Sequence, residues 1–140
     1  MPAEARRKHP ARLSYEVFNK VEAKLSREAI EDFRIDFEDG YGNRSNEEED
    51  ECAVTAAREV AQGMKDKTLP PFIGIRIKPM SKELHARSLR TLDIFIKTLV
   101  KSAKRLPDNF ALTLTKVMAP AHVTEVETEL EQLRRSIDRL

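Results

Sequence analysis

The chain has 140 residues, with 25 Lys and Arg against 24 Asp and Glu, so its formal net charge is only +1. This length suits one domain, and the balanced charge argues against a nucleic-acid partner, which would call for a surplus of cations. The single Cys52 excludes a disulfide framework and fits a reducing, cytoplasmic location. No apolar run approaches the roughly 18 residues of a membrane span, so we expect no membrane partner.

The N-terminal residues 1–12 are basic, and we expect them to form a disordered leader ahead of one domain over residues 13–140. No apolar segment follows them, so they are not a secretory signal, and Glu4 argues against an organellar transit peptide. Val17, Val21 and Leu25 then recur at four-residue steps. This spacing predicts a helix over residues 13–29.

Three short segments are rich in β-branched and aromatic residues, as buried strands are. They cover residues 33–38, 72–77 and 110–117, and prolines precede the second and the third. Apolar residues at helical spacing predict helices from Ser45 or Asn46, from Ser81, and over residues 121–140. We interpret the acidic run 47–51 as the solvated first turn of a helix.

The predicted elements alternate between helix and strand, and the strand centres Ile35, Ile75 and Leu114 are about forty residues apart. Strands that alternate with long crossover helices indicate an α/β fold with a parallel sheet. Ligands of such folds bind at the carboxyl ends of the strands. A small flavodoxin-like domain is a weaker possibility, because the chain has no phosphate-binding loop.

The first strand ends in three carboxylates, Asp36, Glu38 and Asp39, followed by Gly40 and Gly42. Alternation along the strand places Asp36 and Glu38 on one face. Three carboxylates so close together suit Mg²⁺, directly or through water, because this ion prefers oxygen ligands. They could equally form an acidic strand end that caps a helix or pairs with neighbouring cations.

Three cations lie at the carboxyl ends of the other two strands. Arg76 lies between Ile75 and Ile77, so it either pairs with Glu38 or Asp39 or grips an anionic ligand. Lys116 either contacts a carboxylate or phosphate of a ligand or serves as an ordinary cation of a turn. Lys78 precedes Pro79, and we expect it to be exposed.

The remaining candidate groups carry weaker signals. His9, His85 and His122 match no metal motif, and we expect all three at the surface. Cys52 has no neighbouring histidine and is expected to be a small packing residue.

Several of these sequence segments resemble those of the HpcH/HpaI aldolase and citrate lyase β-subunit family, and the resemblance covers about residues 20–135. Residues 36–40 are similar to its Asp-x-Glu-Asp motif, residues 74–77 to the strand that carries its substrate-binding arginine, and residues 114–121 to its LPKVESA stretch. The resemblance implies a (β/α)₈ TIM barrel of the phosphoenolpyruvate- and pyruvate-binding superfamily. It also implies a lyase that makes or breaks a carbon–carbon bond beside a carboxylate.

In this family Mg²⁺ or Mn²⁺ holds a keto acid or an acyl-CoA-type substrate. The resemblance makes Arg76, Glu38 and Asp39 the catalytic residues, with Glu38 and Asp39 near the metal through water. Arg76, Gly40 and Lys116 would bind the substrate.

The family's direct metal ligands come from strands that follow the LPKVESA stretch, and no matching position occurs here. We therefore expect an incomplete barrel of about three strands, inactive as the isolated chain. Its exposed sheet edges favour a homo-oligomer. The alternative is a non-catalytic relic or interaction module in which the acidic and basic strand ends only pair with one another.

Overall fold

The computed structural model describes residues 10–137 and divides into two compact units, Met1–Glu31 and Asp32–Leu140. In the first unit, helix α2 covers Arg12–Arg27, which confirms the predicted helix to within two residues at each end. The leader predicted over residues 1–12 falls mostly outside the described residues. Its last residue, Arg12, already belongs to α2.

The second unit alternates strands and helices in the predicted order. Its elements are β1 (Asp32–Asp36), α3 (Asn46–Asp66), β2 (Phe72–Arg76), α4 (His85–Ala103), β3 (Phe110–Thr113) and α5 (Pro120–Ile137). The three strands form one parallel sheet in the order β1-β2-β3. The predicted α/β class and parallel sheet are confirmed.

The register of the sheet brings the ends of its strands together. Asp36 of β1 lies opposite Arg76 of β2, and Arg76 lies opposite Thr113 of β3. Because the strands are parallel, the chain leaves all three at the same edge of the sheet. The sequence segments that carry the predicted site therefore start from this one edge.

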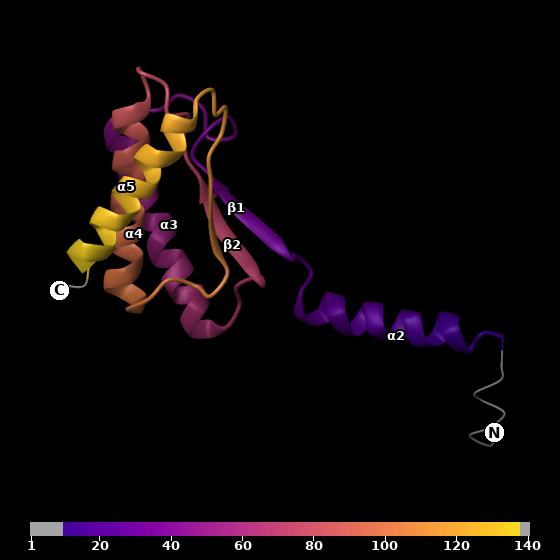
Figure 1. Ribbon diagram of the computed structural model, residues 1–140. Helices are drawn as coiled ribbons and strands as arrows, with labels where there is room; N and C mark the ends of the chain where they lie inside the picture. The colour runs from indigo at the N-terminus through magenta and orange to yellow at the C-terminus, as the bar shows by residue number, and fades with distance from the viewer. Residues whose placement is uncertain (1–9, 138–140) are drawn as a thin grey trace. The chain divides into compact units, whose positions relative to one another are not determined.

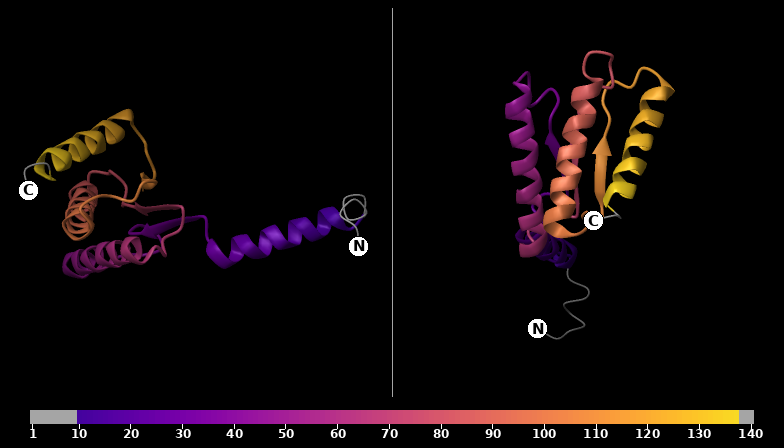
Figure 2. Two further views of the ribbon diagram at one scale, coloured as in Figure 1. Left: turned by 90° about the horizontal axis from the view of Figure 1, so that it is seen from below. Right: turned by 90° about the vertical axis from the view of Figure 1, so that its left-hand side faces the viewer.

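Helices α3, α4 and α5 lie side by side along one face of the sheet (Figures 1 and 2). The core lies between the two layers and contains Ile73, Ile75, Phe95, Leu99 and other apolar side chains. The opposite sheet face carries the alternate residues of the strands, among them Arg34, Asp36, Gly74, Arg76 and Thr113. The unit is thus two-layered, and its second sheet face is polar.

Strand β1 ends at Asp36 instead of residue 38, and two other boundaries differ from the prediction by four residues. Strand β3 ends at Thr113 instead of residue 117, and Lys116 beyond it has a left-handed backbone with φ of 50°. Such a conformation does not continue a strand. Helix α4 begins at His85 instead of Ser81, because the Leu84 and His85 amides both bond the Ser81 carbonyl in a preceding turn.

Helix α3 begins where the sequence indicates. The Ser45 side chain accepts a hydrogen bond from the Glu48 amide at 3.1 Å, as a helix N-cap does.

Within residues 10–137, no helix combines the length and the apolar character that crossing a bilayer requires.

Candidate active site

Asp36 and Arg76 form a two-armed ion pair between β1 and β2. The Arg76 Nε donates to Asp36 Oδ1 at 2.7 Å, and its Nη2 donates to Oδ2. The amides of Glu38 and Gly40 also donate to this carboxylate, each at 2.8 Å. The Arg76 hydrogen bonds, with those amides, lower the pKa of Asp36 to about 2. We expected Glu38 or Asp39 to be the partner of Arg76, and its main partner is Asp36.

Glu38 is buried at the centre of the strand ends, with only 5% of its side chain exposed. Its Oε1 accepts a hydrogen bond from Lys116 Nζ at 2.5 Å. Its Oε2 lies 3.8 Å from Arg76 Nη2, too far for a hydrogen bond. This buried oxygen has no hydrogen-bond partner among the described residues.

Lys116 joins the two outer strands of the site. Besides Glu38, its Nζ donates to Asp39 Oδ1 at 3.0 Å. Its hydrogen bonds to Glu38 and Asp39 raise the pKa of Lys116, and the Lys116 hydrogen bond lowers the pKa of Asp39. Both Lys116 and Asp39 are mostly exposed, whereas Glu38 is not. The exposed pair therefore closes the outer side of the buried carboxylate.

Gly40 acts on the site through its backbone. Its amide bonds Asp36, and a Cβ at this position would overlap the Asp36 carboxylate. A side chain here would push Asp36 away from its position against Arg76. Its predicted contact with a substrate stays a prediction.

A cavity of about 260 Å³ opens beside these groups. It is lined by Glu38, Asp39, Gly42, Asn43, Lys78, Pro79, Leu84 and Lys116. A cavity of this size accommodates a small molecule, close to the lower limit of ordinary ligand pockets.

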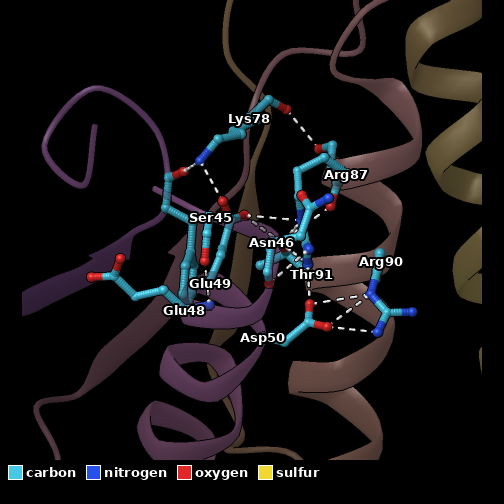
Figure 3. A network of polar contacts seen from close by, with 11 residues as sticks. Ser45, Asn46, Glu48, Glu49, Asp50, Lys78, Arg87, Arg90 and Thr91 are labelled. Carbon is cyan, nitrogen blue, oxygen red and sulfur yellow. Dashed lines mark hydrogen bonds and ion pairs between the residues drawn. The ribbon is translucent and has the colours of Figure 1, made fainter. Parts of the chain in front are cut away.

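Two residues of this region were misjudged from the sequence. Lys78, expected to be exposed, has only 8% of its side chain exposed, and Glu49, expected in a solvated helix start, has 1%. Lys78 Nζ donates to Glu49 Oε2 and to the Phe37 carbonyl, each at 2.7 Å (Figure 3). The signal for Glu49 was its position four residues before Ala53, on the apolar side of the helix.

His85, His122 and Cys52 lie outside the cluster of carboxylates and cations at the strand ends. His85 is partly exposed, 3.3 Å from Glu125, and Cys52 packs at the edge of the core, as predicted. His122 is half-buried instead of exposed, and its Nδ1 has no hydrogen-bond partner among the described residues. His9 lies outside the described residues.

The strand ends thus bring three carboxylates, Asp36, Glu38 and Asp39, against the cations Arg76 and Lys116. In the described part of the chain, no three His, Cys, Asp or Glu side chains are grouped so as to hold a metal ion directly. Glu38 and Asp39 still offer oxygens that could hold a hydrated Mg²⁺ through water. The arrangement could organise a hydrated cation, could bind a small anion beside such a cation, or could serve only as a set of internal ion pairs.

Comparison with family models finds a match over nearly the whole chain. The family described as "Domain of unknown function (DUF6986)" matches residues 3–138. No curated protein and no solved structure matches the chain.

Proposed function

Because the chain belongs to the family described as a domain of unknown function, DUF6986, we propose its function from the site geometry and the sequence resemblance together. We propose that the chain supplies part of the active site of a metal-dependent carbon–carbon lyase of the aldolase type. The substrate would be a keto acid or an acyl-CoA-type carboxylate. Arg76, Glu38 and Asp39 would be its catalytic residues, and Gly40 and Lys116 would assist binding.

The observation that carries this proposal is the unpaired oxygen of Glu38. A buried acceptor without a donor costs about 1–3 kcal/mol, and native structures keep few of them. Here the unpaired Oε2 belongs to a residue that lines a cavity, and it faces Arg76 at 3.8 Å. A ligand or a metal-bound water that donates to this oxygen would remove the cost.

The charge balance supports a cation at this place. Asp36, Glu38 and Asp39 outnumber Arg76 and Lys116 by one, so the cluster as it stands does not attract an anionic substrate. A hydrated Mg²⁺ or Mn²⁺ beside Glu38 and Asp39 would change the net charge of the cluster from negative to positive, and it would polarise the substrate carbonyl.

The contacts of each residue support a role for it in the proposed reaction. Arg76 uses Nε and Nη2 for Asp36, which leaves Nη1 to donate to a substrate oxygen as charge develops on it. Asp36 holds the guanidinium in that orientation. Lys116, anchored on Glu38 and Asp39, would contact the substrate carboxylate, and Glu38 would accept or return a proton.

The topology supports a partial (β/α)₈ barrel as the proposed architecture. Its strands are adjacent in chain order and its helices lie on one sheet face, as in successive βα units of a barrel. A flavodoxin-like fold has the strand order 2-1-3-4-5 and helices on both faces. The polar second face with Arg34, Asp36 and Arg76 would then point into the barrel.

A non-catalytic interaction module is the alternative. It is favoured by the pairing of both cations, since Arg76 and Lys116 each bond a carboxylate already. In that case the strand ends would be structural ion pairs without a ligand.

Ligand binding separates the two proposals. The purified chain would be titrated with pyruvate and with oxaloacetate, with and without Mg²⁺, by calorimetry and by thermal shift. We expect binding that requires Mg²⁺ and that weakens at least about tenfold in Arg76→Ala. The matched control is Arg105→Ala, because Arg105 pairs with Asp108 at the surface. Absence of Mg²⁺-dependent binding, or equal binding by Arg76→Ala, would contradict the lyase proposal and favour the interaction module.

A further inference from the structure

A buried charged network, drawn in Figure 3, includes Lys78, which also lines the cavity of the candidate site. Glu49 of α3 accepts from Lys78 at 2.7 Å and from the Thr91 hydroxyl of α4 at 2.6 Å, and Arg87 lies 3.4 Å from it. The Ser88 hydroxyl donates to the Lys78 carbonyl at 2.7 Å. The segment after β2 is thereby tied to both α3 and α4.

Burial of this ion pair needs an explanation other than stability. Glu49 and Lys78 expose 1% and 8% of their side chains, so both charges are removed from water. Replacing such a pair by apolar residues of similar size is often neutral or stabilising. A pair that brings little net stability can still fix one arrangement of the segments that it joins.

The segment that Lys78 fixes is the one that carries Glu38. Lys78 Nζ donates to the carbonyl of Phe37, the residue immediately before Glu38. The Phe37 amide bonds the Arg76 carbonyl at 2.9 Å, and its ring is fully buried against Phe95. Lys78 also lies 5.3 Å from the centre of the Tyr41 ring, on the far side of the same loop. The loop is thus held on both sides of Glu38 and Asp39.

We infer that Lys78, oriented by Glu49, is a positioning residue that sets the place of the Glu38 carboxylate against Arg76 and the cavity. The role of Lys78 in catalysis rests on the proposed function. The effect of Lys78 on the position of Glu38 concerns the ligand-free chain and can be tested separately. Its physical basis is that Lys78 bonds a backbone atom of the loop, so a change at Lys78 moves the loop itself.

The test compares the variants Lys78→Met, Glu49→Gln and the double variant Lys78→Met/Glu49→Gln. Each single variant breaks the Lys78–Glu49 ion pair while one of its two charges stays buried, and should lower the unfolding temperature. The double variant removes both charges and should regain most of that loss. If the pair were only structural, the double variant would also show native amide hydrogen exchange in the loop and native affinity for pyruvate.

Two readouts distinguish a positioning role. Amide hydrogen exchange of Glu38 and Gly40, whose amides bond Asp36, should be about tenfold faster in the double variant, while the amide of Leu99 in the core is unchanged. The Mg²⁺-dependent affinity for pyruvate should stay about tenfold or more below that of the native chain. The matched control, Asp93→Asn/Lys97→Met, removes a surface pair of 2.6 Å on α4 and should change neither readout.

Native exchange at Glu38 and Gly40 in a stable double variant would overturn the inference. If the native chain binds no pyruvate with Mg²⁺, the proposed function fails, but hydrogen exchange still decides the role of Lys78. Should the double variant not fold, Glu49→Asp replaces it, because it keeps both charges and draws the carboxylate back by one methylene. The same acceleration at Glu38 and Gly40 is then expected, and its absence counts against the inference.

Discussion

Asp36 is the residue on which the charged cluster depends. It receives two hydrogen bonds from the Arg76 guanidinium and two from backbone amides, so it fixes both the cation and the loop after β1. The adjoining Glu38 is left with one oxygen unpaired. Asp36 therefore has its hydrogen bonds supplied within the chain, whereas one oxygen of Glu38 has no hydrogen-bond donor among the described residues.

The depressed pKa of Asp36 predicts a contribution to stability that depends on pH. Its folded-state pKa of about 2 lies below the ordinary 3.8, so the contribution is fully present above pH 4 and is lost as pH falls toward 2. It amounts to about 2 kcal/mol. Urea unfolding should show Asp36→Asn less stable than the native chain by about this amount at pH 6, with the difference shrinking toward pH 2.

The control is Asp108→Asn, which removes an exposed ion pair to Arg105. It should change the free energy of unfolding by less than about 1 kcal/mol. A pH-independent difference between Asp36→Asn and the native chain would show that Asp36 is not held by its Arg76 ion pair.

At the scale of elements, the sheet positions the site through the spacing of its strands. Gly74 lies in the middle of β2, between Arg34 of β1 and Ala111 of β3. A Cβ at Gly74 would overlap the backbone carbonyl of Ala111. The absence of a side chain thus lets β2 and β3 approach closely, two residues before Arg76.

Gly74→Ala should therefore be costly. The overlapping atom belongs to the backbone, so β3 must move away, and we expect a loss of about 3 kcal/mol in the free energy of unfolding by urea titration. Gly42→Ala is the comparison, because position 42 has open space but a φ of 77°. It should lose only about 1 kcal/mol from backbone strain. Equal losses in the two variants would contradict the close approach of β2 and β3.

At the scale of the whole chain, the buried core is confined to the second unit. Its members among the described residues run from Phe37 in the loop after β1 to Leu133 in α5, and none comes from α2. The unit Asp32–Leu140 therefore contains the apolar layer that holds it together. The outer edges of β1 and β3 belong to this unit as well, and neither pairs with another strand among the described residues. The expectation of a homo-oligomer rests on these two edges.

This distribution predicts that residues 1–31 are not needed for folding. A variant that starts at Asp32 should keep a cooperative thermal transition, with a midpoint within about 5 °C of the full chain, monitored by circular dichroism. Loss of cooperativity in the shortened variant, with retention in the full chain, would show that the N-terminal unit contributes to the core.

The sequence by itself determined the alternation of strands and helices, the parallel sheet and the gathering of Asp36, Glu38, Asp39, Arg76 and Lys116 at its carboxyl edge. These follow from local periodicity and from the geometry of parallel strands. Only the tertiary structure decided which carboxylate binds which cation, because side chains two residues apart on a strand end compete for one guanidinium. It also decided that Lys78 and Glu49 are buried, since a charge leaves water only when a partner from a distant segment meets it, as Lys78 of the β2 segment meets Glu49 of α3.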